Sequence, residues 1–260
     1  MFHYTENLFY YYFAYFIAFS MLGWCLEVIY HLYTDKRFIN RGFLHGPVCP
    51  IYGSAAVTLI LTLEPLGNKI WLIFLGGAAV ATILEYFTGW ILELLFNTKW
   101  WDYSKESFNI KGYICLKFSL IWGGMSIIFI KLLYPRVKQM MLSIPAPWSE
   151  ILYNVSLILF VIDATITIAK LFDFKKQFSE LQLISKEIKS NLALLKNKAL
   201  DSRKLEEINH RTEYLKERYQ QLIIMAREKH YHFINAYPRL SSKKFGNVLE
   251  ELKEIIRARL

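Results

Sequence analysis

The sequence lacks the short motifs of several enzyme classes. It contains no GxxxxGK[ST] segment, so the chain has no P-loop of its own, and it contains no GxSxG or HExxH segment. Its three cysteines, Cys25, Cys49 and Cys115, show no paired spacing, which argues against a disulfide framework or a zinc module. Nothing in the sequence supplies an activated nucleophile. We therefore expect that the chain is not an enzyme, that it needs no cofactor and that it holds no metal.

Charged residues are scarce, at 20% of the 260 residues, whereas hydrophobic residues make up 54%. This composition is too apolar for an ordinary soluble domain. The first residues carry no Lys or Arg, so the first apolar stretch is predicted to be a permanent span and not a cleaved signal peptide. We predict an all-α, polytopic membrane bundle with about five spans in a membrane domain over 1–172. The predicted spans are 8–33, 51–63, 70–96, 113–133 and 148–172.

The second span is short, because about 20 helical residues are needed to cross a bilayer. The stretch before it, 38–53, contains three glycines and two prolines, which forbid a regular helix and suit an ordered loop. A partly re-entrant path into a polar vestibule and an ordinary cytoplasmic turn both remain open for this stretch.

Lys and Arg concentrate in three parts of the chain: segment 34–50, segment 97–117 and the region beyond 173. The connection 64–69 has only Lys69, and the segment 134–147, which has Arg136 and Lys138, fits the pattern least well. By the positive-inside rule, the N-terminus of this multi-pass cell-membrane protein is predicted outside and the C-terminus in the cytoplasm.

The last third of the chain is basic and helical in pattern. Residues 173–260 contain 19 Lys and Arg against 12 Asp and Glu, but the two signs alternate, which indicates a solvated helix face and not a nucleic-acid site. Two apolar stripes change phase around Asp201 and Ser202, which predicts a helical hairpin over 173–236. One long coiled-coil helix that forms a homo-oligomer through the tail is the alternative. A terminal amphipathic helix is predicted within 237–260.

Three glutamates, Glu27, Glu85 and Glu93, lie inside the predicted spans. A carboxylate at membrane depth costs at least about 2.5 kcal/mol and needs a partner, a proton or water. Glu85 and Glu93 belong to a stripe of small residues with a four-residue repeat, which predicts a face packed against other helices. The three carboxylates are therefore candidate binding groups. The alternative for Glu27 is a simple ion pair near the membrane surface.

Further candidates lie in the loops. Arg41 is the natural counter-ion for Glu27 or Glu85, because a guanidinium binds a carboxylate with two prongs. Asn40 precedes Arg41 in the sequence. Asp102 could line the opening of the same polar vestibule or merely cap a helix. In the last span, Asp163 and Lys170 share a helix face, and an ion pair is the structural explanation that we favour for them.

Five pieces of the sequence, in order, resemble one family of membrane proteins. They are GWCLEV from Gly23, NRGFLHGPVCPIYG from Asn40, the span with Glu85 and Glu93, WWDYS from Trp100 and FNIKGYICL from Phe108. The chain is similar here to the family called putative ABC-transporter type IV, the CmpB-like integral membrane proteins, over about residues 17–135. The resemblance implies a permease and, with it, a separate ATP-binding subunit.

The leading hypothesis is a transport protein, an ABC-type permease subunit in the lipid bilayer with a cytoplasm-facing polar cavity. Its substrate-binding residues would be Glu27, Glu85, Glu93, Arg41, Asn40 and Asp102. The alternative is a non-transporting membrane scaffold or sensor whose basic helical tail binds a cytoplasmic partner.

The charge pattern generates a prediction about orientation. A single cysteine introduced beyond Phe174, in a background without the native cysteines, should not react with an impermeant maleimide added to intact cells, because the tail is expected inside. The same position should react after the cells are opened. Labelling from outside would contradict the orientation.

Overall fold

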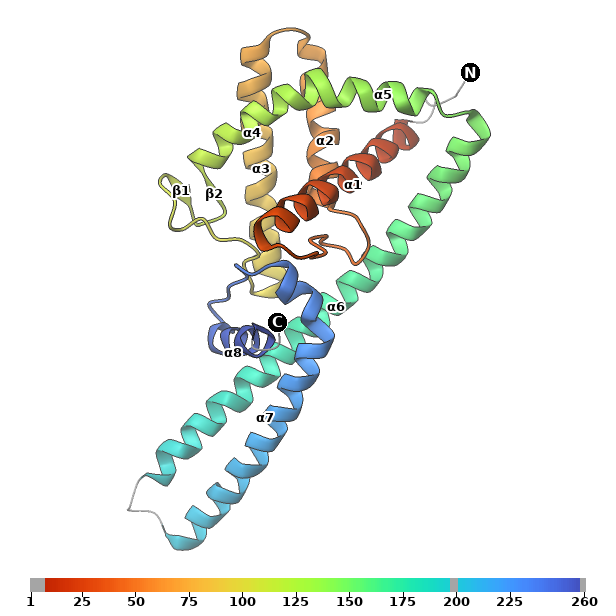
Figure 1. Ribbon diagram of the computed structural model, residues 1–260. Helices are drawn as coiled ribbons and strands as arrows, with labels where there is room; N and C mark the ends of the chain where they lie inside the picture. Colours follow the sequence, from red (N-terminus) through yellow and green to blue (C-terminus); the bar gives the residue numbers. More distant parts are fainter. Residues whose placement is uncertain (1–7, 197–200, 258–260) are drawn as a thin grey trace.

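The computed structural model describes residues 8–196 and 201–257 (Figure 1). Helices make up most of it, which confirms the all-α bundle. Four stretches are long and apolar enough to cross a membrane: α1 (Leu8–Asp35), α3 (Ile70–Phe96), the continuous run α4–η3–α5 (Leu116–Leu142), and the first part of α6 (Ala146–Leu195). The shorter helix α2 (Pro50–Leu63) continues into the 3-10 turn η2 (Glu64–Leu66). The chain is a membrane protein on this evidence.

Helix α2 begins deep inside the bundle. Its 14 residues span only about 21 Å, less than the roughly 30 Å of a bilayer core. The amide of Cys49, just before α2, donates to the carbonyl of Ser20 at 3.1 Å, and Ser20 lies near the middle of the 28-residue helix α1. The connection 36–49 therefore runs back along the second half of α1, and we call it the re-entrant loop for this path.

Small residues allow close helix contacts. A Cβ atom on Gly53 would lie 2.1 Å from the Ser20 hydroxyl, so α2 can approach α1 only with glycine there. A Cβ atom on Gly77 of α3 would likewise lie 2.2 Å from Ser126 of α4. The predicted small-residue stripe on α3 is thus a packing face, and it points at α4 and at the segment after α3.

The hydropathy pattern predicted that the fourth apolar helix ends at residue 133, but the helix continues beyond it. It passes through the π-helical turn η3 (Phe129–Leu133) into α5 (Tyr134–Leu142). Pro135 stands in the first turn of α5, where the wider π turn accommodates its ring. Arg136 and Lys138 therefore lie on a helix and not in a loop.

Helix α6 continues for 50 residues, across the predicted domain boundary at 172/173 and out of the apolar bundle. Helix α7 (Ser202–Ala236) packs antiparallel against its second half (Figure 1). Phe178 and Leu181 of α6 share a buried cluster with Leu215 and Ile223 of α7. The hairpin is confirmed, and a single extended helix is wrong for this tail.

The terminal amphipathic helix is α8 (Gly246–Arg257), which buries its apolar face in the same cluster. Phe96 and Trp100, at the end of α3, also belong to this cluster. A two-residue hairpin, β1 (Asn109–Ile110) with β2 (Ile114–Cys115), precedes α4. The tail is thus packed directly onto the end of the membrane bundle.

His230 generates a prediction about the tail. Its side chain is fully buried between α6 and α7, with Nε2 3.0 Å from Gln177 Oε1. Burial lowers the pKa of His230 from 6.5 to about 4, against the opposing effect of the Asp173 carboxylate. Between about pH 6.5 and pH 4, the unfolded tail binds a proton that the folded tail does not, so stability falls as the pH drops through this window.

We expect a loss on the order of 3 kcal/mol by pH 4, read as a lower melting temperature with a fluorophore attached in the tail. His230→Gln should weaken this pH dependence. His210→Gln, at an exposed position of the same helix, should keep it. An unchanged pH dependence in His230→Gln would contradict the assignment.

Candidate functional site

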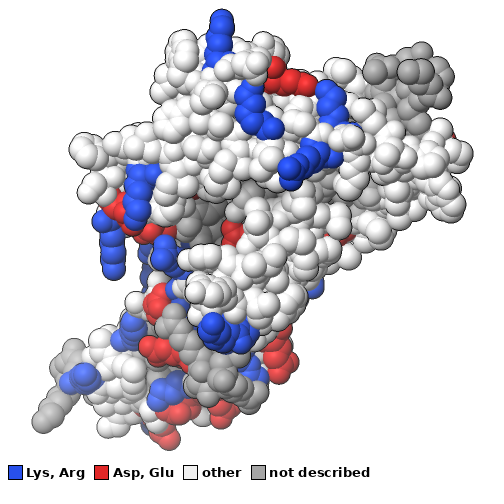
Figure 2. All heavy atoms as spheres, turned by 45° about the horizontal axis from the view of Figure 1, so that its top comes forward, with Lys and Arg blue, Asp and Glu red and all other residues white. Residues whose placement is uncertain are grey.

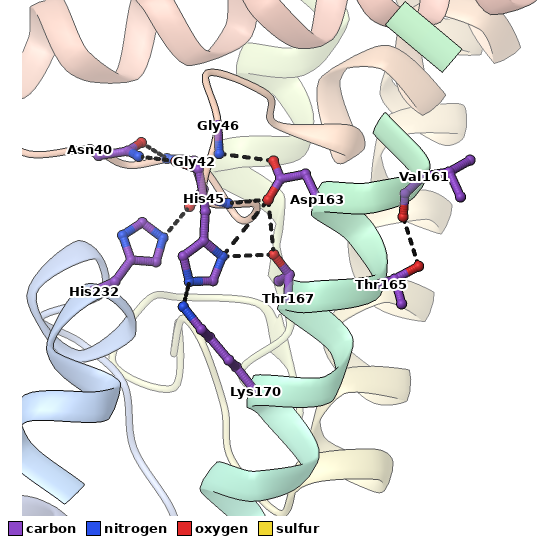
Figure 3. A network of polar contacts seen from close by, with 10 residues as sticks. All are labelled: Asn40, Gly42, His45, Gly46, Val161, Asp163, Thr165, Thr167, Lys170 and His232. Atoms are coloured by element: carbon purple, nitrogen blue, oxygen red, sulfur yellow. Dashed lines mark hydrogen bonds and ion pairs between the residues drawn. The ribbon is translucent and has the colours of Figure 1, made fainter. Parts of the chain in front are cut away.

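The re-entrant loop is held by a carboxylate from α6 (Figure 3). Asp163 accepts the backbone amide of His45 at 3.0 Å with Oδ1 and the amide of Gly46 at 2.8 Å with Oδ2. A Cβ atom at position 46 would lie 2.9 Å from Oδ2, so glycine permits this close approach. These two amides lie outside any helix and so lack an intrahelical acceptor, and the single Asp163 side chain satisfies both.

The expected ion pair of Asp163 with Lys170 is not what forms, because each residue has a different partner in the loop. Lys170 Nζ lies 2.9 Å from Nε2 of the His45 ring, and Thr167 Oγ1 lies 2.9 Å from its Nδ1. Since an ammonium can only donate, Nε2 accepts and the ring proton is on Nδ1. One face of α6 therefore binds both the backbone and the side chain of this loop.

The tail contacts the other side of the same loop. His232 of α7 stacks on His45, with ring centroids 5.0 Å apart, and its Nε2 lies 3.2 Å from the carbonyl of Gly42. Burial and the neighbouring His45 lower the pKa of His232. The ring is therefore neutral near pH 7, and it donates from Nε2 to the Gly42 carbonyl.

Glu27 lies where α1, the loop and α2 meet. The hydroxyl of Tyr52 donates to its Oε1 at 2.6 Å, and Nε of Arg41 lies 3.8 Å from its Oε2. Of the two partners that the sequence left open for Arg41, Glu27 and Glu85, the structure places Glu27 beside it. The same guanidinium donates through Nη1 to the carbonyl of Ala236 and lies over the Tyr237 ring, so it also binds the end of α7.

Glu85 and Glu93 of α3 face the segment after α3 and not Arg41. The hydroxyl of Tyr103 donates to Glu85 Oε1 at 3.0 Å, and the hydroxyl of Tyr113 donates to Glu93 Oε2 at 2.6 Å. Lys99 Nζ lies 3.9 Å from Glu93 Oε2. Within the described residues, Glu85 has no basic partner, and its buried Oε2 has no hydrogen-bond partner.

Each of the three glutamates therefore accepts a tyrosine hydroxyl. Burial and the Glu85 carboxylate raise the pKa of Tyr103, and burial with the Glu93 hydrogen bond raises the pKa of Tyr113 to about 12. Both hydroxyls thus stay protonated and act as donors. Sequence reasoning missed these partners, although each tyrosine lies within one of the sequence pieces quoted above.

The two remaining site candidates support the loops. Asn40 accepts the Trp24 indole N–H at 2.7 Å and donates to the carbonyl of His45, so it shapes the re-entrant loop. Asp102 accepts the amide of Ser104 at 3.0 Å with Oδ1 and so holds its own turn. The six predicted residues thus form two groups: Glu27, Arg41 and Asn40 around the re-entrant loop, and Glu85, Glu93 and Asp102 around the segment 97–115.

The loop contacts generate a prediction. Asp163→Ala leaves the amides of His45 and Gly46 without their acceptor, at about 1.5–3 kcal/mol for each lost charged hydrogen bond. Hydrogen exchange should therefore rise in the peptides that cover 38–49. Thr165→Ala is the matched control, because the Thr165 hydroxyl bonds only the Val161 carbonyl of its own helix and points away from the loop (Figure 3). Equal exchange in both variants would contradict the role of Asp163.

Comparison with known proteins gave one family match. The family model described as putative ABC-transporter type IV matches residues 14–168, more than half of the chain. The match includes both loops, all three glutamates, and Asp163 and Thr167 of α6, but not Lys170. Neither the curated proteins nor the solved structures gave a significant match. The chain therefore belongs to the putative ABC-transporter type IV family.

Proposed function

We propose that this protein is a membrane transport protein, the permease subunit of an ABC-type transporter. In this proposal the intramembrane carboxylates bind a cation, a proton or a basic group of the substrate. The family membership supports the transporter class. The surroundings of Glu85 support the binding role.

Glu85 carries the argument. Its side chain is only 8% exposed, and its polar neighbours are neutral: one carboxylate oxygen accepts the Tyr103 hydroxyl, and the Trp122 indole of α4 also interacts with the carboxylate. By geometry, Oε2 is buried without a hydrogen bond among the described residues. An ionised carboxylate in such surroundings is costly unless a proton or a cation neutralises it. A transport site needs a group that can bind and release a proton or a cation, and Glu85 meets this requirement.

Glu27 and Glu93 differ from Glu85, because each has a basic neighbour that also belongs to a tail contact. Arg41 lies beside Glu27 and binds the carbonyl of Ala236. Lys99 lies beside Glu93, and its backbone exchanges two hydrogen bonds with Ser241, at 2.7 and 2.9 Å. A shift of the tail would move both basic residues relative to the carboxylates. This arrangement supports a role of the tail in controlling access to the site.

The proposal places the tail in the cytoplasm of the cell, where a separate ATP-binding subunit would bind it. The chain has no P-loop motif, so in this proposal the ATP-binding site is on the separate subunit. A second copy of the chain could also assemble through the tail. The cell membrane, with the N-terminus outside, is the proposed location.

A non-transporting scaffold or sensor is the second candidate, and one observation favours it. The tail has a large buried cluster of its own, which also includes Phe96 and Trp100 of the membrane half. A rigid connection of this kind suits a protein whose output is the tail. In that case the carboxylates would only hold the bundle together.

Transport assays distinguish the two. We expect Glu85→Gln and Glu27→Gln to reduce uptake or efflux by about tenfold or more in proteoliposomes screened with cations and basic amines, because the amide cannot exchange a proton or bind a cation. Glu106→Gln, at a half-exposed position in the segment 97–115 that is paired only with the exposed Lys117, should have no effect. Folded yields should stay near that of the parent protein. If both variants simply fail to fold, the charges are structural and the transport proposal loses its support.

A further inference from the structure

An open apolar depression of about 710 Å³ lies at the end of the bundle opposite the tail. Its walls come from the start of α3 and from α4. The lining residues are Asn68, Lys69, Ile70, Trp71, Phe74, Leu75 and Ile127.

The apolar part of this depression faces the lipid. Ile70, Trp71 and Leu75 are more than half exposed, although they belong to a helix that crosses the membrane. Trp71, in the first turn of α3, is at the level where interfacial aromatic residues are usual. A hydrocarbon chain is therefore the natural content of this depression.

Basic groups stand at its mouth. Lys69 lines it. Lys131, one turn beyond Ile127, lies next to it, with Nζ 2.7 Å from the carbonyl of Gly67 and 2.7 Å from Oδ1 of the lining residue Asn68. Figure 2, in which this end of the molecule comes forward, shows basic side chains spread over it with little acid between them.

The nearby carboxylate does not neutralise these two lysines. Glu64 is bound by Lys138 at 3.0 Å and by the Tyr134 hydroxyl at 2.9 Å. Lys69 and Lys131 have no ion pair among the described residues. Lys131 uses two of its three N–H donors on Gly67 and Asn68, which leaves one donor and an unneutralised positive charge for an anion. Lys69 adds a second positive charge beside it.

From this combination we infer a binding site for an anionic phospholipid of the leaflet opposite the tail. One acyl chain lies in the depression between α3 and α4, and the headgroup phosphate binds Lys69 and Lys131. The site is separate from the carboxylates and does not depend on the transport proposal. Two other occupants fit the site less well. A soluble anion would bind the lysines but leave the apolar depression empty, and a second copy of this chain would need an acidic group at the level of the lysines.

Native mass spectrometry of the full-length protein tests the site. The probes are phosphatidylglycerol and phosphatidylcholine with identical acyl chains. We expect the protein to retain phosphatidylglycerol about fivefold more than phosphatidylcholine, because basic residues at the membrane surface attract anionic lipid. Lys69→Gln with Lys131→Gln should abolish the preference. Lys131→Arg should keep it, and so should Lys138→Gln, whose lysine is already paired with Glu64.

Two further arms separate the sources of the phosphate. Leu75→Trp should fill the depression and lower the retention of phosphatidylglycerol, while glycerol phosphate should not displace the bound lipid. Equal retention of both lipids by the parent protein would mean ordinary annular lipid and overturn the proposal. So would a preference that survives in the double variant, or full displacement by glycerol phosphate.

Discussion

Non-helical backbone inside a membrane bundle needs hydrogen-bond partners from the protein, and the loop between α1 and α2 is where this chain meets that constraint. The carboxylate of Asp163 binds two successive amides of the loop. Asn40 closes the loop from within, and the Ser20 carbonyl receives the amide of Cys49. Without these acceptors, an unpaired amide would cost about 1–3 kcal/mol or more in apolar surroundings. The short helix α2 thus begins beside the middle of α1, at the end of a loop that this network holds.

The same loop carries the tail contacts. His45 contacts Lys170 on one side and stacks on His232 on the other, while Arg41 contacts both Glu27 and the end of α7. The segment after α3 repeats the pattern, because Lys99 lies beside Glu93 and its backbone pairs with Ser241. Two loops from different parts of the chain thus each join a membrane carboxylate to the tail.

Apolar packing holds these polar contacts in place. Phe233 and Leu240 of the tail are almost fully buried in the cluster that includes Phe96 and Trp100. Each fully buried side chain of this kind contributes about 1.5–3 kcal/mol. The exposed ion pairs of the hairpin, such as Arg218 with Glu180, contribute much less, because solvent screens them. The position of the tail therefore depends mainly on its buried apolar side chains.

Hydropathy and helical periodicity alone determined most of the helices. They located α1 and α3 within two residues, indicated the short α2, and identified the hairpin from the phase change near Asp201. They also singled out Glu27, Glu85 and Glu93, because the transfer cost of a carboxylate depends only on the apolar segment that contains it. Arg41 followed from charge complementarity, as a counter-ion for Glu27 or Glu85.

Only the tertiary structure decided which groups meet. His45 and Asp163 are 118 positions apart, and no local pattern in either segment contains information about the other. The tyrosine partners of the glutamates could not be predicted for the same reason, since Tyr103 and Tyr113 lie in irregular segments whose paths depend on packing. The unbroken helices α4–η3–α5 and α6 were missed because hydropathy reports where a segment leaves the lipid, whereas the backbone hydrogen bonds of a helix continue into water. The sequence thus determined which carboxylates need partners in this membrane protein, and the tertiary structure decided which residues lie next to them.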